Sequence, residues 1–581
     1  MKKLFVFCGL MFAVCYLAMA PRAGRAEPLP SVLSDQDATN YAIIFDLQRR
    51  EKISDAEKLE KDLGNPVLMD EVLLQRYMCK TYRAQGKEIS DWMAKNYDLP
   101  GADMMAKLAK KKKTAARAPK VPDIISGGAE SLAQSETWTQ KTYAGAAGKK
   151  INQFKAALRK GNTKNARNIL EDGALKKGLS AGDYGRLCGR LAFLYYADGE
   201  ADMAKKFGKT AAQSKSEYGL WTLGLMAYKD GDFAAAQKYF SDILTIDQIN
   251  DARKSEVSFW AGRAAEGAGD ADAANKFWGD AAARPNTFYG ALALAKMGKE
   301  PAYDFFEQEC TDEDIAELLD NKYGFAALAL LQINEKAAAE KYLRYLITRD
   351  ASDRMLHAVH SVASMAELPR TSMQVAGVIK SREITEIDPN VIFSAQYPMP
   401  DWEPLGGWGI DRALVFAITR QESAFKANAT SRVGAGGLMQ LMPRTAKIVA
   451  RQNNMNMSDI DISNPEHNMF LGQQHIADLF AQPGIDNDII KMLVSYNSGN
   501  GAMQKFEKNF QTDDSLLYIE SFPATETRTY VKRVLSNLWL YRARLGQPLN
   551  SINDLAAGRW PKYESADKFA SDEQKPGVDK I

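Results

Sequence analysis

Apolar residues recur every three or four positions along most of this 581-residue chain, and no stretch keeps a period of two. Tyr41, Ile44 and Phe45 mark one such face near the start, and Asn65-Pro66 is typical of the beginning of another helix. A spacing of three to four places side chains on one face of a helix, whereas a half-buried strand needs alternation. The pattern therefore predicts an all-α fold.

Short polar turns interrupt an Ala-rich helical pattern between about Lys149 and Glu300. The turns centre on Gly199, Gly231 and Gly269, roughly 32 to 38 residues apart, and each follows a helix with large apolar residues three or four apart. Such repeats predict stacked helical hairpins, an α-solenoid. Helical patterning continues to about Phe393, so we predict a solenoid domain over residues 149–395.

The N-terminus has the pattern of an export signal. Lys2 and Lys3 precede an uncharged apolar run from Leu4 to Ala20, and small residues lead to Ala26. This order predicts a cleavable signal peptide over residues 1–26 and hence a periplasmic protein. A retained anchor is the alternative, because a run of about 17 apolar residues is near the lower limit for crossing a bilayer.

Composition shifts suggest the remaining boundaries. Residues 111–148 carry a basic run, Pro119, Pro122 and Gly127-Gly128, which predicts a linker after an N-terminal helical segment at 27–110. Tyr397-Pro398-Met399-Pro400 marks the start of a last domain, predicted over residues 396–560. The charged residues 561–581 predict a disordered tail.

Overall composition excludes several classes of protein. Hydrophobic residues make up 45% of the chain and charged residues 25%, as in ordinary globular proteins. The formal net charge of +2 gives no argument for a nucleic-acid partner. No nucleotide or dinucleotide motif is present, so we expect no cofactor. His357 and His360 lack a third ligand pattern, as do His467 and His475, so no metal site is expected.

One carboxylate stands out in the last domain. Leu414 and Ile418 lie on one face of a helix expected after Asp411, and Glu422 continues that apolar face. Partial burial should raise the pKa of a carboxyl group and keep a proton available for general acid catalysis. The alternative is a frayed helix end with Glu422 in water.

Further motifs follow Glu422. A Gly-rich loop from Gly434 to Pro443 lets the backbone approach a ligand, and Gln440 in it offers an amide to a substrate. A buried helix from Ile489 gives way to Ser495–Gly501, which includes Tyr496. Glu526 is placed near the start of a later helix, where capping is its alternative role.

These stretches together resemble the soluble lytic murein transglycosylases. The resemblance covers about Tyr397 to Tyr541, with a weaker likeness upstream at Trp260–Ala264 and Thr287–Gly290. The matching elements, in order, are Arg420–Phe425, Gly434-Ala435 with Gly437–Gln440, Tyr496-Asn497 with Gly499 and Gly501, and Glu526–Arg528 with Tyr530-Val531. The resemblance implies a lysozyme-like catalytic domain after an N-terminal superhelical ring domain.

The same resemblance implies a reaction and a substrate. Family members cleave the β-1,4 bond between N-acetylmuramic acid and N-acetylglucosamine without water, leaving a 1,6-anhydro end. It implies that Glu422 acts first as general acid and then as base. It places a set of residues in the groove for peptidoglycan glycan strands: Ser431, Gln440, Met442, Tyr496, Asn497 and Glu526. Proteins of the cell-wall machinery are candidate partners.

Two other functions stay open from the sequence. A lysozyme-type hydrolase would share the fold but would need an activated water and usually a second carboxylate. A non-catalytic helical scaffold that binds peptidoglycan or other proteins would use the solenoid alone. That scaffold gives no reason for Glu422 to continue an apolar helix face beside the matching loops.

Overall fold

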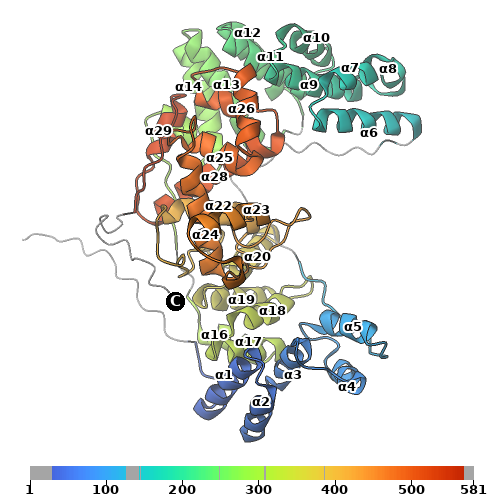
Figure 1. Ribbon diagram of the computed structural model, residues 1–581. Coiled ribbons are helices and arrows are strands. Elements are labelled where there is room, and N and C mark those ends of the chain that lie inside the picture. Colours follow the sequence, from blue (N-terminus) through green and yellow to red (C-terminus); the bar gives the residue numbers. More distant parts are fainter. Residues whose placement is uncertain are drawn as a thin grey trace, which may run out of the picture. The chain divides into compact units, whose positions relative to one another are not determined.

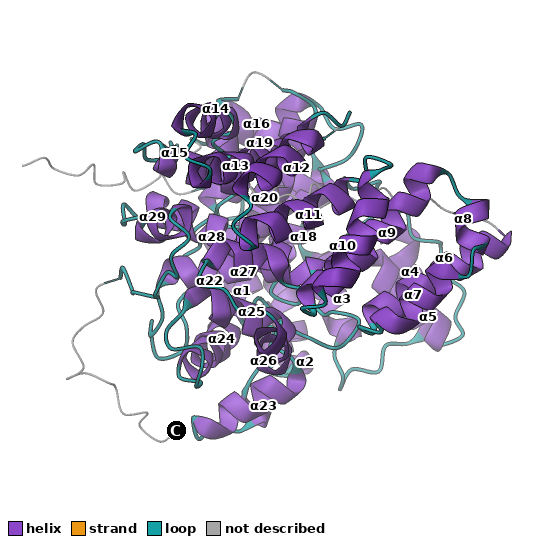
Figure 2. Cartoon of the chain, turned by 90° about the horizontal axis from the view of Figure 1, so that it is seen from above, coloured by secondary structure: helices purple, strands orange, loops and turns teal. Residues whose placement is uncertain are grey.

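The computed structural model describes residues 29–125, 143, 145–247, 249–306, 309–384 and 387–567. These residues form 29 α-helices and two short 3₁₀ helices, and within these ranges the β-structure is confined to isolated bridges. Figure 2 shows only helices and loops accordingly. The predicted all-α fold is confirmed.

The chain divides into two compact units, each built from two segments. Among the described residues, unit 1 comprises those of 29–124 and 309–366, and unit 2 comprises those of 125–306 and 367–567. The helices of residues 309–366 thus join the N-terminal helices and not the helices that directly precede them in the sequence. The predicted solenoid of residues 149–395 is divided between the two units, and its boundaries stay predictions.

Unit 1 packs two helical segments into one body. Its N-terminal half has a core around Leu74, Ile89, Trp92 and Met105. The Gln332 side chain accepts hydrogen bonds from the backbone of Val32 and Leu33, which ties the first described residues to the second segment. Its helices are α1 (Asp35–Arg49), α2 (Ile53–Leu59), η1 (Glu60–Asp62), α3 (Met69–Met78), α4 (Gly86–Asn96), α5 (Ala102–Lys111), α16 (Asp312–Leu319), α17 (Lys322–Gln332), α18 (Lys336–Tyr345) and α19 (Asp353–Met365).

Unit 2 begins with the helical hairpins that the repeats predict (teal to green in Figure 1). The three polar turns lie between α9 and α10, α11 and α12, and α13 and α14. Gly199, Gly231 and Gly269 have φ of +79°, +79° and +81°, a conformation that favours glycine. The helices are α6 (Gly145–Arg159), α7 (Thr163–Glu171), α8 (Ala174–Gly178), α9 (Ala181–Ala197), α10 (Ala201–Ala212), α11 (Glu217–Lys229), α12 (Phe233–Leu244), α13 (Asp251–Gly267), α14 (Ala271–Ala282) and α15 (Phe288–Lys296).

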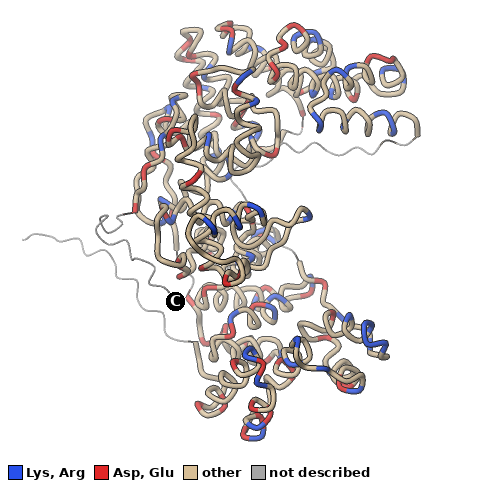
Figure 3. Tube along the Cα trace, in the orientation of Figure 1, with Lys and Arg blue, Asp and Glu red and all other residues tan. Residues whose placement is uncertain are grey.

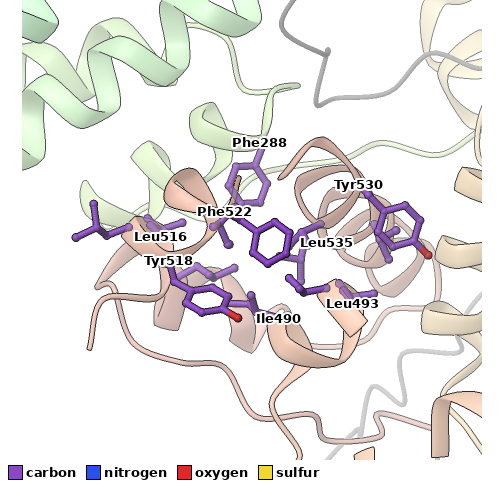
Figure 4. Close-up of a cluster of buried hydrophobic side chains, with 14 of the residues drawn as sticks. Phe288, Ile490, Leu493, Leu516, Tyr518, Phe522, Tyr530 and Leu535 are labelled. Carbon is purple, nitrogen blue, oxygen red and sulfur yellow. The ribbon is translucent and has the colours of Figure 1, made fainter. Parts of the chain in front are cut away.

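The rest of unit 2 packs around one long buried helix, α28. This helix contacts α22, α25 and α27 and also the solenoid helix α15. Phe288 of α15 stacks on Trp539 of α28, and Figure 4 shows Phe288 and Phe522 in one apolar cluster. The helices are α20 (Pro369–Ser381), α21 (Pro389–Ala395), α22 (Arg412–Ser423), α23 (Pro443–Gln452), η2 (Met457–Asp459), α24 (Pro465–Phe480), α25 (Ile489–Ser498), α26 (Asn500–Asn509), α27 (Ser515–Ser521), α28 (Thr525–Arg544) and α29 (Asn550–Ala556).

Two predicted boundaries need correction at their described ends. Residues 111–125 are not a flexible linker, because they contact the helical segment before them. Arg117 lies over the Tyr97 ring, and the Lys120 amide donates a hydrogen bond to the Tyr97 carbonyl. The tail does not start at 561, because Tyr563 stacks on Phe480 and Asp567 binds Arg412. Ring packing and ion pairing keep both segments against the fold. The predicted signal peptide, 126–142 of the linker and 568–581 of the tail lie outside the described residues.

No described helix is both long enough and apolar enough to cross a lipid bilayer.

Candidate active site

Glu422 occupies the last turn of α22, and the chain reverses immediately after it. Ala424 and Phe425 have φ of +47° and +61°, a pair of left-handed residues that costs about 1 kcal/mol or more each. Arg420 anchors the end of the helix through the Gln396 carbonyl at 2.7 Å and the Asn537 side chain at 3.2 Å. The surrounding structure therefore fixes where the Glu422 carboxyl lies.

The surroundings of Glu422 favour its neutral form. The pKa of Glu422 is raised to about 7, mainly by burial and to a smaller extent by the negative charge of Glu526. The Tyr530 hydroxyl opposes this shift by offering a hydrogen bond to the carboxylate. The side chain is half-buried, so it is still reachable from solvent. A carboxyl group with these properties suits general acid catalysis near neutral pH.

Two tyrosines stand beside Glu422. Their rings, Tyr496 of α25 and Tyr530 of α28, are nearly parallel, with centroids 6.4 Å apart. Burial, and the nearby Glu422 charge, raise the pKa of both hydroxyls well above the usual value, so both remain donors. Figure 4 shows the Tyr530 hydroxyl directed away from the apolar cluster. Among the described residues, no group meets ordinary hydrogen-bond geometry at the Tyr530 hydroxyl, but this hydroxyl lies close enough to Glu422 to lower the pKa of its carboxyl group.

The Gly-rich loop is held by its own polar side chains. The Ser431 hydroxyl accepts from the Ala435 amide at 2.9 Å. The Gln440 amide donates to the Gly437 carbonyl within the loop at 2.9 Å and to the Ala429 carbonyl before the loop at 3.2 Å. Met442 is instead exposed at 42%. Ser431 and Gln440 therefore shape the loop, while Met442 offers an apolar surface to a ligand.

The close approach of neighbouring atoms to the backbone explains why residue 437 of this loop is a glycine. Gly437 has φ of +78°, and an added Cβ would collide with the Asn468 side chain and the Ile462 carbonyl. Asn468 in turn accepts the Met439 amide at 2.8 Å. The loop thus lies against the chain leading into α24, where any side chain at 437 would displace it.

The other predicted site residues lie on α25 and α28. Asn497 accepts a hydrogen bond from the Thr527 hydroxyl at 2.8 Å, which joins the two helices. Helix α25 continues to Ser498, so Tyr496 and Asn497 are helical and not in a loop as their sequence suggests. Glu526 is exposed in the first turn of α28, as predicted.

The structure therefore brings Glu422, Tyr496 and Glu526 together and ties the Gly-rich loop to them. The Tyr496 hydroxyl donates to the Met439 carbonyl at 2.8 Å.

Tyr530 was not predicted from the sequence as a site residue. Tyr530 follows Glu526 by four residues, which places both on the same face of a helix, and this spacing could have indicated that Tyr530 lies near the site.

Replacing Tyr496 by Phe tests whether the hydrogen bond from the Tyr496 hydroxyl to the Met439 carbonyl positions the loop. We expect the free energy of unfolding in urea to fall by about 1 kcal/mol, because one buried hydrogen bond is lost while the ring remains. We expect KM for the substrate of this site to rise by up to about tenfold, since the loop loses this hydrogen bond. Tyr239→Phe, on α12, is the control. Unchanged stability and KM in Tyr496→Phe would contradict this role.

Among the described residues, no group of three or more His, Cys, Asp or Glu side chains could hold a metal ion.

Comparison with known protein families identifies a match in the C-terminal part of the chain. Residues 403–519 match the family model of the transglycosylase SLT domain. The range contains the Glu422 helix, the Gly-rich loop and Tyr496, although it ends before Glu526 and Tyr530. The C-terminal part of the chain is thus similar to a transglycosylase SLT domain.

Curated relatives and solved structures extend the match. The soluble lytic murein transglycosylases of Salmonella typhimurium and Escherichia coli K12 are 35% identical over 153 and 156 residues. Each match covers 26% of this chain and 23% or 24% of the relative, so this chain spans about a quarter of their length. A membrane-bound lytic murein transglycosylase C of Actinobacillus pleuropneumoniae is 31% identical over 222 residues, 35% of this chain and 56% of the relative.

Two solved structures share the fold. An inactive mutant of the lytic transglycosylase Slt from Pseudomonas aeruginosa has a TM-score of 0.53 at 17% identity, covering 88% of this chain and 87% of that one. A 70-kDa soluble lytic transglycosylase in complex with bulgecin A gives 0.55 at 16%, covering 91% and 100%. The predicted resemblance to the soluble lytic murein transglycosylases is therefore confirmed, as is the predicted fold class.

Proposed function

We propose that this protein is a lytic transglycosylase that cleaves peptidoglycan glycan strands and leaves 1,6-anhydro-N-acetylmuramic acid ends. The observation that carries the proposal is the half-buried Glu422, whose pKa is raised to about 7, at the end of a fixed helix. The SLT-domain match and the similar curated relatives support the same reaction class.

The reaction needs one carboxyl group in two successive roles. Protonated Glu422 gives its proton to the glycosidic oxygen, and the bond from that oxygen to C1 of N-acetylmuramic acid breaks. Glu422 then accepts the proton of the C6 hydroxyl while that oxygen forms a new bond to C1. No water is consumed, and Glu422 ends protonated as it began.

The neighbours of Glu422 support both roles. Tyr530 offers a hydrogen bond to the carboxylate form, which stabilises it between the two steps. Glu526 opposes the carboxylate form, which keeps the proton on Glu422 before the reaction. Ser431, Gln440 and Tyr496 shape the groove by fixing its loop, and Met442 contributes an apolar contact to the sugar. Asn497 and Glu526 line the same groove.

The pH dependence tests the acid role. Because the pKa of Glu422 is about 7, its acid form is present below pH 7 and lost above it. We expect kcat/KM to fall about tenfold per pH unit above that value. Glu526→Gln removes a charge that raises this pKa, so the falling limb should move to lower pH. Asp513→Asn, an exposed carboxylate outside this group, should leave the limb in place. A limb that Glu526→Gln does not move would contradict the assignment.

Export to the periplasm fits this substrate, and we propose it together with cleavage of residues 1–26. Peptidoglycan is the proposed partner, with cell-wall machinery proteins as further candidates.

Release of soluble fragments from purified peptidoglycan sacculi tests the proposal. The protein without its first 26 residues should release anhydro-ended fragments, detected by mass spectrometry. Reducing ends would favour the lysozyme-type hydrolase. Binding to sacculi without release would favour the scaffold.

A further inference from the structure

The longest uninterrupted run of basic residues in the chain, 110–113, lies in unit 1 at the end of α5. It belongs to a wider segment, residues 107–120, which we call the basic segment. Seven Lys and Arg residues and no Asp or Glu occur in it, and all seven are exposed. Figure 3 shows a blue stretch at the end of α5 accordingly.

The basic segment has a fixed backbone beyond α5, because it packs along α4. At the start of α4, a Cβ added to Gly86 would meet the Thr114 hydroxyl. At its end, the Lys120 amide donates to the Tyr97 carbonyl at 2.8 Å, and Arg117 lies over the Tyr97 ring. A partner therefore meets cations on an ordered surface and does not have to order a flexible chain on binding.

The acids that flank the basic segment do not neutralise it. Asp103 pairs with Lys107 at 3.2 Å, and Asp123 pairs with Arg349 of the second part of unit 1 at 2.8 Å. Among the described residues, no acid forms an ion pair with any other lysine of the segment. A surplus of positive charge therefore faces solvent.

Stabilisation of α5 explains only part of this charge. Basic residues in the last turn of a helix oppose the helix dipole, and Lys110 and Lys111 have that place in α5. Lys113, Arg117 and Lys120 follow the helix, beyond the reach of this effect. Their charges are therefore open to a partner.

Exposed apolar side chains accompany the cations. Met104 lies on the same face of α5 as Lys107 and Lys111, three and seven residues later, and is 37% exposed. Val121 follows Lys120 directly and is 50% exposed. Lysines beside exposed apolar residues are typical of surfaces that bind an anionic bilayer, where cations meet phosphates and apolar side chains enter the headgroup layer.

We propose that the basic segment binds the surface of an anionic phospholipid bilayer. The cations without an acidic partner are mostly lysines, whose compact charge suits a diffuse layer of phosphates, whereas arginine suits paired contacts with single carboxylates. The Tyr97 ring is covered by Arg117 and is not open to stack on a nucleic-acid base. The inference does not depend on the proposed function, because the segment lies in unit 1 and Glu422 in unit 2.

Flotation with lipid vesicles tests the inference. The protein lacks residues 1–26, whose apolar run would itself enter a bilayer. The vesicles contain equal parts of phosphatidylglycerol and phosphatidylcholine, or phosphatidylcholine alone. We expect binding to the anionic vesicles only, weakened about tenfold when salt rises from about 0.1 M to about 0.5 M, because salt screens the charges. Equal binding to both kinds of vesicle, or binding to neither, would overturn the inference.

Removal of charge locates the contact. The segment variant is Lys110→Gln/Lys111→Gln/Lys112→Gln/Lys113→Gln, and the control loses the same charge from four exposed lysines of unit 2. We expect affinity for anionic vesicles to fall at least about twentyfold in the segment variant and less than about twofold in the control. Equal losses in the two variants, or no loss in the segment variant, would refute the inference. The control positions are Lys205, Lys209, Lys254 and Lys276.

A variant that keeps the charge separates electrostatics from damage to the fold. Replacing the same four lysines of 110–113 by Arg should keep binding to anionic vesicles within about threefold of the wild type, since each position stays cationic. A loss as large as in the Gln variant would mean that the charge is not the cause, and would contradict the inference.

Purified peptidoglycan sacculi, which contain no lipid, separate this partner from the proposed substrate. The segment variant should bind and cleave sacculi within about twofold of the wild type. A variant that keeps vesicle binding but loses sacculus binding would assign the segment to peptidoglycan and overturn the inference. If the wild type cleaves no sacculi, the proposed function fails, while the vesicle result still decides this inference.

Discussion

Glu422→Gln is expected to keep the fold and to lower kcat on peptidoglycan by about a thousandfold or more. The amide has the shape of the carboxyl group but can neither give a proton to the glycosidic oxygen nor take one from the C6 hydroxyl. Binding to sacculi should be retained, because the loop contacts of Gln440 and Tyr496 do not involve Glu422. Turnover is measured by release of soluble fragments.

The stability of the same variant is an internal control. Burial raises the pKa of Glu422 above its ordinary value of 4.5, so ionising it costs stability once the pH passes through that range toward 7. Glu422→Gln should therefore be at least as stable as the wild type at pH 8. A variant that loses both activity and stability there, or one that keeps its activity, would contradict the assigned role.

Lys532→Ala is expected to lower the free energy of unfolding by about 3–5 kcal/mol. Lys532 is buried in α28 and pairs with Glu256 of α13 at 2.6 Å and Glu520 of α27 at 2.8 Å. Tyr289 of α15 also donates to Glu520, at 2.5 Å. Removing Lys532 takes the cation away from the buried Glu520 carboxylate, while Glu256 keeps its ion pair with Arg253 at 2.5 Å. Denaturation in urea measures the loss.

Two further variants separate charge from packing. Lys508→Ala removes an exposed lysine from α26 and should change stability by less than about 0.5 kcal/mol. Lys532→Met with Glu520→Gln removes both charges of this pair together, leaves Glu256 paired with Arg253, and should recover much of the loss. If this double variant is as unstable as Lys532→Ala, the buried ion pair between Lys532 and Glu520 is not the cause.

Local patterns in the sequence were enough to predict the elements around the site. Asp411 caps α22 by accepting from the Ala413 amide, and Pro443 begins α23, as their positions in the sequence indicate. The apolar stripe that leads to Glu422 is buried, and the polar turns of the solenoid fall where glycine and aspartate predict them. Each feature depends on residues that are neighbours along the chain.

Contacts between residues that lie far apart in the sequence could not be predicted from such local patterns. The buried group of Glu256, Tyr289, Glu520 and Lys532 joins four helices, and nothing near any one residue marks its partners. The division of the helices between the two units depends likewise on contacts between segments far apart in sequence. Tyr530 gains its place beside Glu422 only when α28 packs against α22.

The origin of the oxygen at the new sugar end tests the central claim most directly. Peptidoglycan is digested by the protein in water enriched in heavy oxygen, and the fragments are weighed by mass spectrometry. We expect anhydro ends that are lighter by one water than reducing ends and free of the heavy isotope, and we expect Glu422→Gln to form none. Reducing ends that carry heavy oxygen would mean that water attacks C1, and would contradict it.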